Sequence, residues 1–293
     1  MRKFGLALLS IALMGFPISE GSATGRLILG APASGGAAAY TGPGDVTTFS
    51  QWYGIRAYSA AKRGTAAINV CNSTGGVDVG CADLSTDATT GKLVSATVSA
   101  ITCPGTNCTI KTFYDQTGGG GDCTQATVAS RATLPATGGP GSNPTASFNG
   151  SQNYTCGTTT GTQPVSLSAV ADRTGNTSAF NSVISFGFTV DLLFNNSTNS
   201  VGEYAGSVLA TAATDGSFHA VQALANGASS SIYVDGSSTA GNAGTTSPST
   251  NTRFGTGVGG SCTCNIVEGG TIASDKSANF AALNSNQHSF WGF

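Results

Sequence analysis

Charged side chains are scarce in this sequence. Lysine, arginine, aspartate and glutamate make up 9% of its 293 residues, and the formal net charge is −2. So weak a field offers no basic surface for nucleic acid or for anionic lipids. Beyond the N-terminal segment, no apolar run is long enough to cross a bilayer. We therefore expect neither nucleic acid nor, once that segment is removed, a membrane among the partners.

The N-terminal segment has the layout of a secretory signal peptide. Arg2 and Lys3 precede an apolar stretch over residues 4–18, and the small residues Gly21, Ser22 and Ala23 follow it. Basic, apolar and small-residue regions in this order are typical of a cleaved signal. We expect residues 1–23 to be removed and residues 24–293 to form one secreted domain, extracellular or periplasmic.

Helical periodicity is also rare, and it favours helices only over Thr48–Ser59 and Ala278–Gln287. Elsewhere, short runs rich in β-branched and aromatic residues alternate with clusters of Gly, Asn, Ser and Thr, as in sheet proteins. We read Ser237–Asn251 as a long polar loop. The pattern predicts an all-β fold, a two-sheet β-sandwich or jelly roll of the concanavalin A-like kind. The expected strands are Ala66–Val70, Thr109–Tyr114, Thr145–Phe148, Val165–Ala171, Ser182–Phe188, Val190–Phe194, Phe218–Leu224, Ser231–Val234, Arg253–Val258 and Asn265–Ile272.

The eight cysteines all follow the predicted signal peptide, and an even count in a secreted chain indicates disulfides. A Pro-Gly turn favours the pair Cys103–Cys108. The Gly75-Gly76 turn favours Cys71–Cys81 across a hairpin, which leaves Cys123–Cys156 as a long-range pair. The pairing of Cys262 and Cys264 stays open, because a bond across one residue is uncommon.

The sequence predicts no metal site and no cofactor. The cysteine spacings are not those of zinc sites, and both histidines are far from any cysteine. The stretch FYDQTGGGGDCTQA, residues 113–126, has no lysine after its glycines, so it does not form a phosphate loop. Its oxygen-bearing side chains match no calcium loop known to us, and calcium binding stays open. We interpret the run as a tight turn in which Asp115 and Asp122 accept hydrogen bonds from backbone amides.

The same stretch carries a family resemblance. Residues 53–70 (YGIRAYSAAKRGTAAINV), 103–126 (CPGTNCTIKTFYDQTGGGGDCTQA) and 145–155 (TASFNGSQNYT) resemble the catalytic domain of α-L-arabinofuranosidase B, glycoside hydrolase family 54. Residues 218–236 (FHAVQALANGASSSIYVDG) and 282–293 (ALNSNQHSFWGF) are similar to the wider group of concanavalin-like and laminin-G-like sandwiches. The resemblance implies a β-sandwich that binds or cleaves arabinose-containing glycans.

The catalytic residues that the resemblance implies are poorly matched. A retaining glycosidase needs two carboxyl groups about 5–5.5 Å apart. In that family the nucleophile is a glutamate in an Asp-Leu-Glu-Asn-Gly strand, whereas this chain has Asp191-Leu192-Leu193-Phe194-Asn195, with Glu203 nearby. The family's acid/base is an aspartate after a Gly-Gly pair, and Ser261 stands there. The family's adjacent cysteine pair is also absent. Asp191 and Glu203 remain the catalytic candidates, while a solvated strand-end position is the alternative for Glu203. Glu268 is expected to be structural, either accepting hydrogen bonds from backbone amides or pairing with an arginine.

Sugar binding without hydrolysis requires less, namely an aromatic platform and a few polar groups. Four aromatic residues in or beside polar loops are the candidates for such a platform: Trp52, Tyr53, Tyr154 and Tyr204. We assign Trp291 to a strand or core position that closes the sheet and His219 to a half-buried strand position.

Three functions therefore stay open: an arabinofuranosidase-like hydrolase, a lectin-like module that only binds the glycan, and a structural or adhesion protein of the cell surface. The sequence does not decide the glycan or the oligomeric state.

Overall fold

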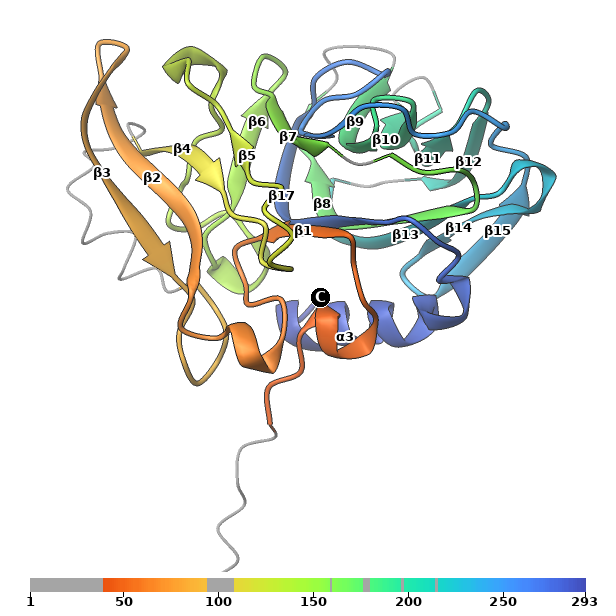
Figure 1. Ribbon diagram of the computed structural model, residues 1–293, viewed down its shortest axis with the longest axis horizontal. Coiled ribbons are helices and arrows are strands. Elements are labelled where there is room, and N and C mark those ends of the chain that lie inside the picture. Colours follow the sequence, from red (N-terminus) through yellow and green to blue (C-terminus); the bar gives the residue numbers. More distant parts are fainter. Residues whose placement is uncertain (1–38, 94–107, 159, 176–179, 196–197, 214–215) are drawn as a thin grey trace, which may run out of the picture. The chain divides into compact units, whose positions relative to one another are not determined.

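The computed structural model describes residues 39–93, 108–158, 160–175, 180–195, 198–213 and 216–293. The stretch Ala39–Phe293 forms one compact unit. Its strands pair antiparallel in two sheets, which face each other across a shared core (Figure 1). Among the described residues, no helix combines the length and apolar character that crossing a membrane requires. The predicted all-β sandwich is therefore confirmed, whereas the predicted signal peptide lies outside the described residues.

The smaller sheet has seven strands among the described residues, in the order β1-β17-β8-β13-β14-β15, with β6 paired to β17. Its central strands are buried on both faces, because the larger sheet covers one side and the C-terminal helix α3 (Phe280–Trp291) covers part of the other. Figure 1 shows α3 running beneath β1 and β13. The strands are β1 (Gln51–Gly54), β6 (Ala146–Asn149), β8 (Val165–Arg173), β13 (His219–Ala225), β14 (Ser230–Val234), β15 (Ser237–Gly241) and β17 (Thr263–Ile272).

The larger sheet has ten strands among the described residues, in the order β12-β11-β10-β9-β16-β7-β5-β4-β2-β3. It begins beside β14 and β15 of the smaller sheet and ends at the long hairpin of β2 and β3. The strands are β2 (Ala66–Thr74), β3 (Val77–Ser85), β4 (Cys108–Phe113), β5 (Cys123–Thr124), β7 (Tyr154–Thr158), β9 (Phe180–Phe186), β10 (Val190–Asn195), β11 (Ser200–Tyr204), β12 (Val208–Ala213) and β16 (Asn251–Phe254).

Aromatic rings fill the core between the sheets. The ring of Phe254 lies 5.0 Å from that of Phe113 and 6.1 Å from that of Phe148, and Tyr154 meets Phe113 edge to face. These four residues come from β16, β4, β6 and β7 and are at most 1% exposed. Edge-to-face packing of this kind adds to the free energy of burying the rings. The cluster therefore ties distant parts of the chain together.

A buried ion pair joins the smaller sheet to α3. The side chains of Arg56 and Glu268 are both fully buried, and the Arg56 guanidinium donates two hydrogen bonds to the carboxylate. Arg56 also donates to Asn286 of α3 and lies over the ring of Phe290. Burial raises the pKa of Glu268, and the Arg56 guanidinium opposes that shift. Glu268 therefore has an arginine partner, as expected.

The ten predicted strands are all present, but the predicted helix over Thr48–Ser59 is wrong. That stretch contains β1, whose residue Trp52 pairs with Gly270 of β17 and whose four residues are all buried. Burial on both faces removes the alternation that marks an exposed strand, so the pattern was mistaken for a helix. The predicted helix over Ala278–Gln287 is confirmed as α3. Trp291 ends that helix and not a strand, and the alternative core position predicted for it is confirmed. Ser237–Asn251 contains β15 and is therefore not only a loop.

The glycine-rich stretch forms the predicted turn. Asp115 accepts hydrogen bonds from the backbone amides of Trp52, Thr117 and Gly121, and Asp122 accepts one from the amide of Asp115. At Gly121 a side chain would collide with Gln51 of β1, since an added Cβ would lie 2.3 Å from its Nε2. The run therefore anchors β1 against the turn that follows β4.

Disulfides join Cys71 to Cys81, Cys123 to Cys156 and Cys262 to Cys264. The first links the facing strands β2 and β3, and the second links the neighbouring strands β5 and β7. The bond across Thr263, which the sequence left open, does form. Cys108 is also disulfide-bonded, but its predicted partner Cys103 lies outside the described residues.

We predict that Glu268→Gln lowers the free energy of unfolding by about 3–5 kcal/mol, because it leaves the buried Arg56 charge without its counter-ion. Chemical denaturation measures this loss. Lys111→Gln is the matched control. The Lys111 side chain is 40% exposed and pairs with Asp78, so its loss should change stability by less than about 1 kcal/mol. Equal effects of the two substitutions would contradict the role given to the buried pair.

Candidate functional site

A row of polar side chains crosses the outer face of the ten-stranded sheet. Strand pairing places its members side by side on adjacent strands, so they share one face at a spacing of about 4.8 Å. Asp83, Thr124 and Thr155 are exposed, whereas Ser185 and Asp191 at the other end are buried. We call this set the polar row: Tyr204, Asp191, Ser185, Arg253, Thr155, Thr124, Thr112, Asn69 and Asp83.

The positions next to the polar row form an apolar row on the inner face. Because successive side chains of a strand point to opposite faces, this second row lines the core. Glu203 of β11 is its exception: it pairs with Leu192 on one side and Leu209 on the other. The row contains Leu84, Ile68, Phe113, Cys123, Tyr154, Phe254, Ile184, Leu192, Glu203 and Leu209.

Glu203 is fully buried, and neither of its carboxyl oxygens has a hydrogen-bond partner. Burial raises the pKa of Glu203 well above the ordinary carboxyl value, and no neighbouring group opposes the shift. Burial without a partner therefore favours the protonated form of this carboxyl. The alternative of a solvated strand-end glutamate is wrong, because the sheet pairing turns this side chain inward.

Asp191 belongs to the outer face, where a glycine-rich loop covers it. Its Oδ2 accepts hydrogen bonds from the Ser182 hydroxyl at 2.7 Å and the Gly259 amide at 3.2 Å. A Cβ on Gly257 would lie 2.4 Å from the same oxygen, so only glycine permits this approach. Burial raises the pKa of Asp191, and hydrogen bonds from Ser185, Ser182 and the loop amides partly offset the shift. The structure thus brings Asp191 together with the Gly-Gly turn that precedes Ser261.

The two catalytic candidates do not form a pair. Asp191 lies opposite Tyr204, whereas Glu203 lies opposite Leu192, so the two carboxyl groups are on opposite faces of one sheet. Ser261 contributes a hydroxyl where the family resemblance implied an acid/base, and it contacts Thr256. None of the described residues that contact Asp191 carries a second carboxylate.

Three of the four candidate platform residues are buried. Trp52, Tyr53 and Tyr154 are each 0% exposed, so in this structure none presents a ring face to a sugar. The Tyr53 hydroxyl donates to the Gly121 carbonyl and that of Tyr154 to the Ile110 carbonyl, which ties both rings to the core. Tyr204 is half-buried in the polar row and stays a candidate.

Sequence reasoning missed an arginine and a phenylalanine at the middle of the outer face. Arg253 of β16 lies in the polar row between Ser185 and Thr155. Its guanidinium carbon is 5.1 Å from the ring centre of Phe188, which is 41% exposed. Phe188 follows Gly187 in the turn between β9 and β10. In the sequence, both residues fall inside the predicted strand Ser182–Phe188, whereas β9 ends at Phe186. The glycine shortly before the next predicted strand is the signal for a tight turn.

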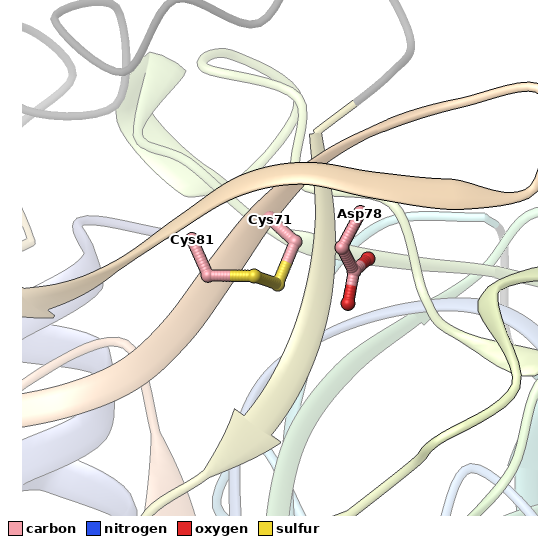
Figure 2. Close-up of side chains that lie close together, drawn as sticks. All are labelled: Cys71, Asp78 and Cys81. Carbon is pink, nitrogen blue, oxygen red and sulfur yellow. A yellow bond between two sulfur atoms is a disulfide. The ribbon is translucent and has the colours of Figure 1, made fainter.

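Cys71, Asp78 and Cys81 are close enough together to resemble a metal site (Figure 2). The two sulfurs are joined in a disulfide, however, and are not thiolate ligands. Asp78 is already bound by Arg131 at 2.6 Å and by Ser73 at 3.0 Å. The hydrogen bond from Arg131 is the main reason that the pKa of Asp78 falls to about 2. The cluster stabilises the β2–β3 hairpin and does not offer three ligands.

His219 and His288, the two histidines of the sequence, both bind Asp235. His219 is half-buried on β13, as expected, and His288 lies on α3. Asp235 follows β14 in a turn and also accepts a hydrogen bond from the amide of Ala220. These contacts fasten α3 to β13 and to the turn after β14 in the smaller sheet, whereas the polar row lies on the larger sheet.

A scan of protein-family models finds no match to this sequence, and a search of curated proteins finds none either. Solved structures do match. An arabinofuranosidase complexed with arabinofuranosyl-α-1,2-xylobiose has a TM-score of 0.68 at 16% identity, over 85% of this chain and 65% of that one. A second match is a family 54 α-L-arabinofuranosidase, a glutamate-to-glutamine mutant soaked with 4-nitrophenyl α-L-arabinofuranoside. Its TM-score is 0.67 at 17% identity, over 86% of this chain and 65% of that one. Another, soaked with a cyclic sulfate inhibitor, gives 0.64 at 17% identity over the same shares.

These matches confirm that the chain has the β-sandwich fold of family 54 arabinofuranosidases, as the resemblance implied. The chain spans about 65% of the length of each of these structures. At this level of identity the likeness concerns the fold.

We predict that Glu203→Gln removes part of the pH dependence of stability. The native carboxyl has a raised pKa, so unfolding releases its proton and wild-type stability falls as pH rises above the ordinary carboxyl pKa of about 4.3. Relative to the variant, the wild type should lose about 1.4 kcal/mol per pH unit until the raised pKa is reached. Denaturation of both proteins from pH 4 upward gives the comparison. A constant difference across that range would disprove the buried protonated carboxyl.

Proposed function

We propose that this chain is a secreted carbohydrate-binding domain that recognises glycans bearing arabinofuranose and hydrolyses them weakly or not at all. Its fold is that of enzymes whose structures contain arabinofuranosyl-xylobiose or 4-nitrophenyl α-L-arabinofuranoside. Secretion is supported by the signal-like N-terminal sequence and by the disulfides.

The observation that carries the proposal is the separation of Asp191 and Glu203 by the sheet itself. Retaining hydrolysis requires two carboxyl groups about 5–5.5 Å apart beside one glycosidic bond, and inverting hydrolysis requires about 6.5–9.5 Å with a water between them. Glu203 faces the core, where no glycan reaches it, and Asp191 is covered by the loop that contains Gly257 and Gly259. Neither arrangement is available to this pair.

The polar row provides what binding requires. Thr112, Thr124, Thr155 and Asn69 offer hydroxyl and amide groups on consecutive strands of an outer face that is not apolar. Sugar hydroxyls are recognised by a small number of such groups placed on a rigid support. At about 4.8 Å per strand, the row from Arg253 to Asn69 is about 19 Å long. It suits an extended chain better than one small molecule.

Hydrolysis is the second candidate, and one observation favours it. Asp191 lies beside the Gly-Gly turn, and burial raises its pKa, as expected of a carboxylic acid that donates a proton. An active enzyme would then need a partner carboxylate that reaches Asp191 only after the loop moves.

We predict binding without turnover. Calorimetry of residues 24–293 with an arabinosyl-substituted xylo-oligosaccharide should give a measurable affinity, while 4-nitrophenyl α-L-arabinofuranoside should be released slowly or not at all. Thr112→Ala should weaken binding about 3- to 10-fold by removing one hydrogen bond, and Thr89→Ala, in an exposed loop, should not change it. Robust turnover that Glu203→Gln abolishes would refute the proposal, as would the absence of binding.

A further inference from the structure

We propose that Arg253 and Phe188 form a subsite for the carboxylate of an acidic sugar, a uronic acid residue within the bound glycan. The inference rests on the proposed glycan-binding function and makes its ligand more specific. Two observations carry it. The side chain of Arg253, on the outer face of the ten-stranded sheet, has no hydrogen-bonding partner among the described residues, and the ring beside it belongs to a phenylalanine whose backbone conformation is unfavourable.

The guanidinium of Arg253 is uncommitted. No described carboxylate lies within ion-pair distance of it, and its Nε is buried without a hydrogen-bond partner. Its one side-chain contact of defined geometry is the ring of Phe188. By contrast, Arg56 and Arg131 each bind a carboxylate. A buried donor left without an acceptor is costly in a folded protein. The two terminal nitrogens of Arg253 are not among the buried unpaired atoms, so a ligand can reach them.

Phe188 has a backbone φ of +58°, in the left-handed region. A bulky side chain rarely adopts this conformation, and glycine or asparagine normally occupies such turn positions. Strained residues of this kind persist mainly at ligand sites and switches. Here the strained turn places an exposed ring beside Arg253. The ring beside the guanidinium restricts its position, which prepares its donors for a planar acceptor.

A carboxylate is the acceptor that fits such a planar pair of donors, because two parallel N–H···O bonds form at once. The nearest acidic residue in the row does not compete: Ser185 separates Asp191 from Arg253, and the Asp191 carboxyl is engaged by Ser182 and Gly259. On the other side of Arg253, the exposed hydroxyls of Thr155 and Thr124 continue the row. When the carboxylate of a uronic acid binds Arg253, the rest of the glycan can therefore lie along the polar row.

The test is calorimetry on the oxidised chain, residues 24–293, with four oligosaccharides. These are a glucuronic-acid-substituted xylotetraose, the same compound with its carboxyl group reduced to an alcohol, a sulfated xylotetraose and an arabinosyl-substituted xylotetraose. We expect carboxyl reduction to weaken binding about 10- to 100-fold, the effect of hydrogen bonds to a charged group. High salt should weaken binding of the acidic compound more than that of the reduced one.

Four variants locate the effect. Arg253→Gln should abolish the preference for the carboxylate, and Arg253→Lys should restore only part of it, because lysine keeps the charge without the planar pair of donors. Phe188→Gly should weaken binding of the acidic compound without lowering the melting temperature, since glycine relieves the strain. Arg63→Gln is the matched control: this arginine also lies over a ring, that of Tyr40, but it donates to backbone carbonyls, and its loss should not affect binding.

Equal affinity for the acidic and reduced compounds, or a carboxylate preference that survives Arg253→Gln, would overturn the inference. If the arabinosyl compound still binds in that case, the proposed glycan-binding function is retained and only the uronic acid subsite is refuted. Preference for the sulfated compound over the carboxylate would identify a sulfate subsite and refute the choice of a uronic acid. Failure of all four compounds to bind would overturn both proposals.

Discussion

The register of the ten-stranded sheet is the constraint on which the rest of the molecule depends. Pairing between β10 and β11 fixes Asp191 opposite Tyr204 and Glu203 opposite Leu192. Because side chains alternate between faces, a shift of one residue would move Glu203 to the outer face and Asp191 into the core. The aromatic cluster around Phe254 sets the same register from the inner side. One constraint thus produces a core, a polar outer face and the separation of the two carboxyl groups.

The sheet contains one local conflict with this pattern, the carboxyl of Glu203 in an apolar row. A buried charge without partners is costly, so the site favours the neutral form of this carboxyl. The other buried glutamate, Glu268, is stabilised in a different way, because an arginine donates two hydrogen bonds to its carboxylate. The comparison explains why burial by itself does not assign a function. One carboxyl lowers stability as the pH rises, and the other joins α3 to its sheet.

Much of the fold follows from the sequence, because strand alternation and turn residues are local signals. All ten predicted strands exist, and the aspartates of the glycine-rich turn bind backbone amides as expected. The β1 strand was mistaken for a helix, because burial on both faces leaves no alternation. The candidate site was less predictable. The face on which Glu203 lies and the burial of Trp52 depend on the strand order and on the position of α3. No local sequence pattern encodes either of these.

Binding and hydrolysis place different demands on one sandwich. Hydrolysis depends on two carboxyl groups at one fixed separation, so a change of one register position is enough to remove it. Binding is distributed over side chains on several strands, each of which contributes little. The outer face can therefore keep a row of hydroxyl, amide and guanidinium groups while Asp191 and Glu203 lie on opposite faces of the sheet. The strained turn at Phe188 relates to binding, because its ring lies beside Arg253 of the polar row. The loop that covers Asp191 does not depend on this turn.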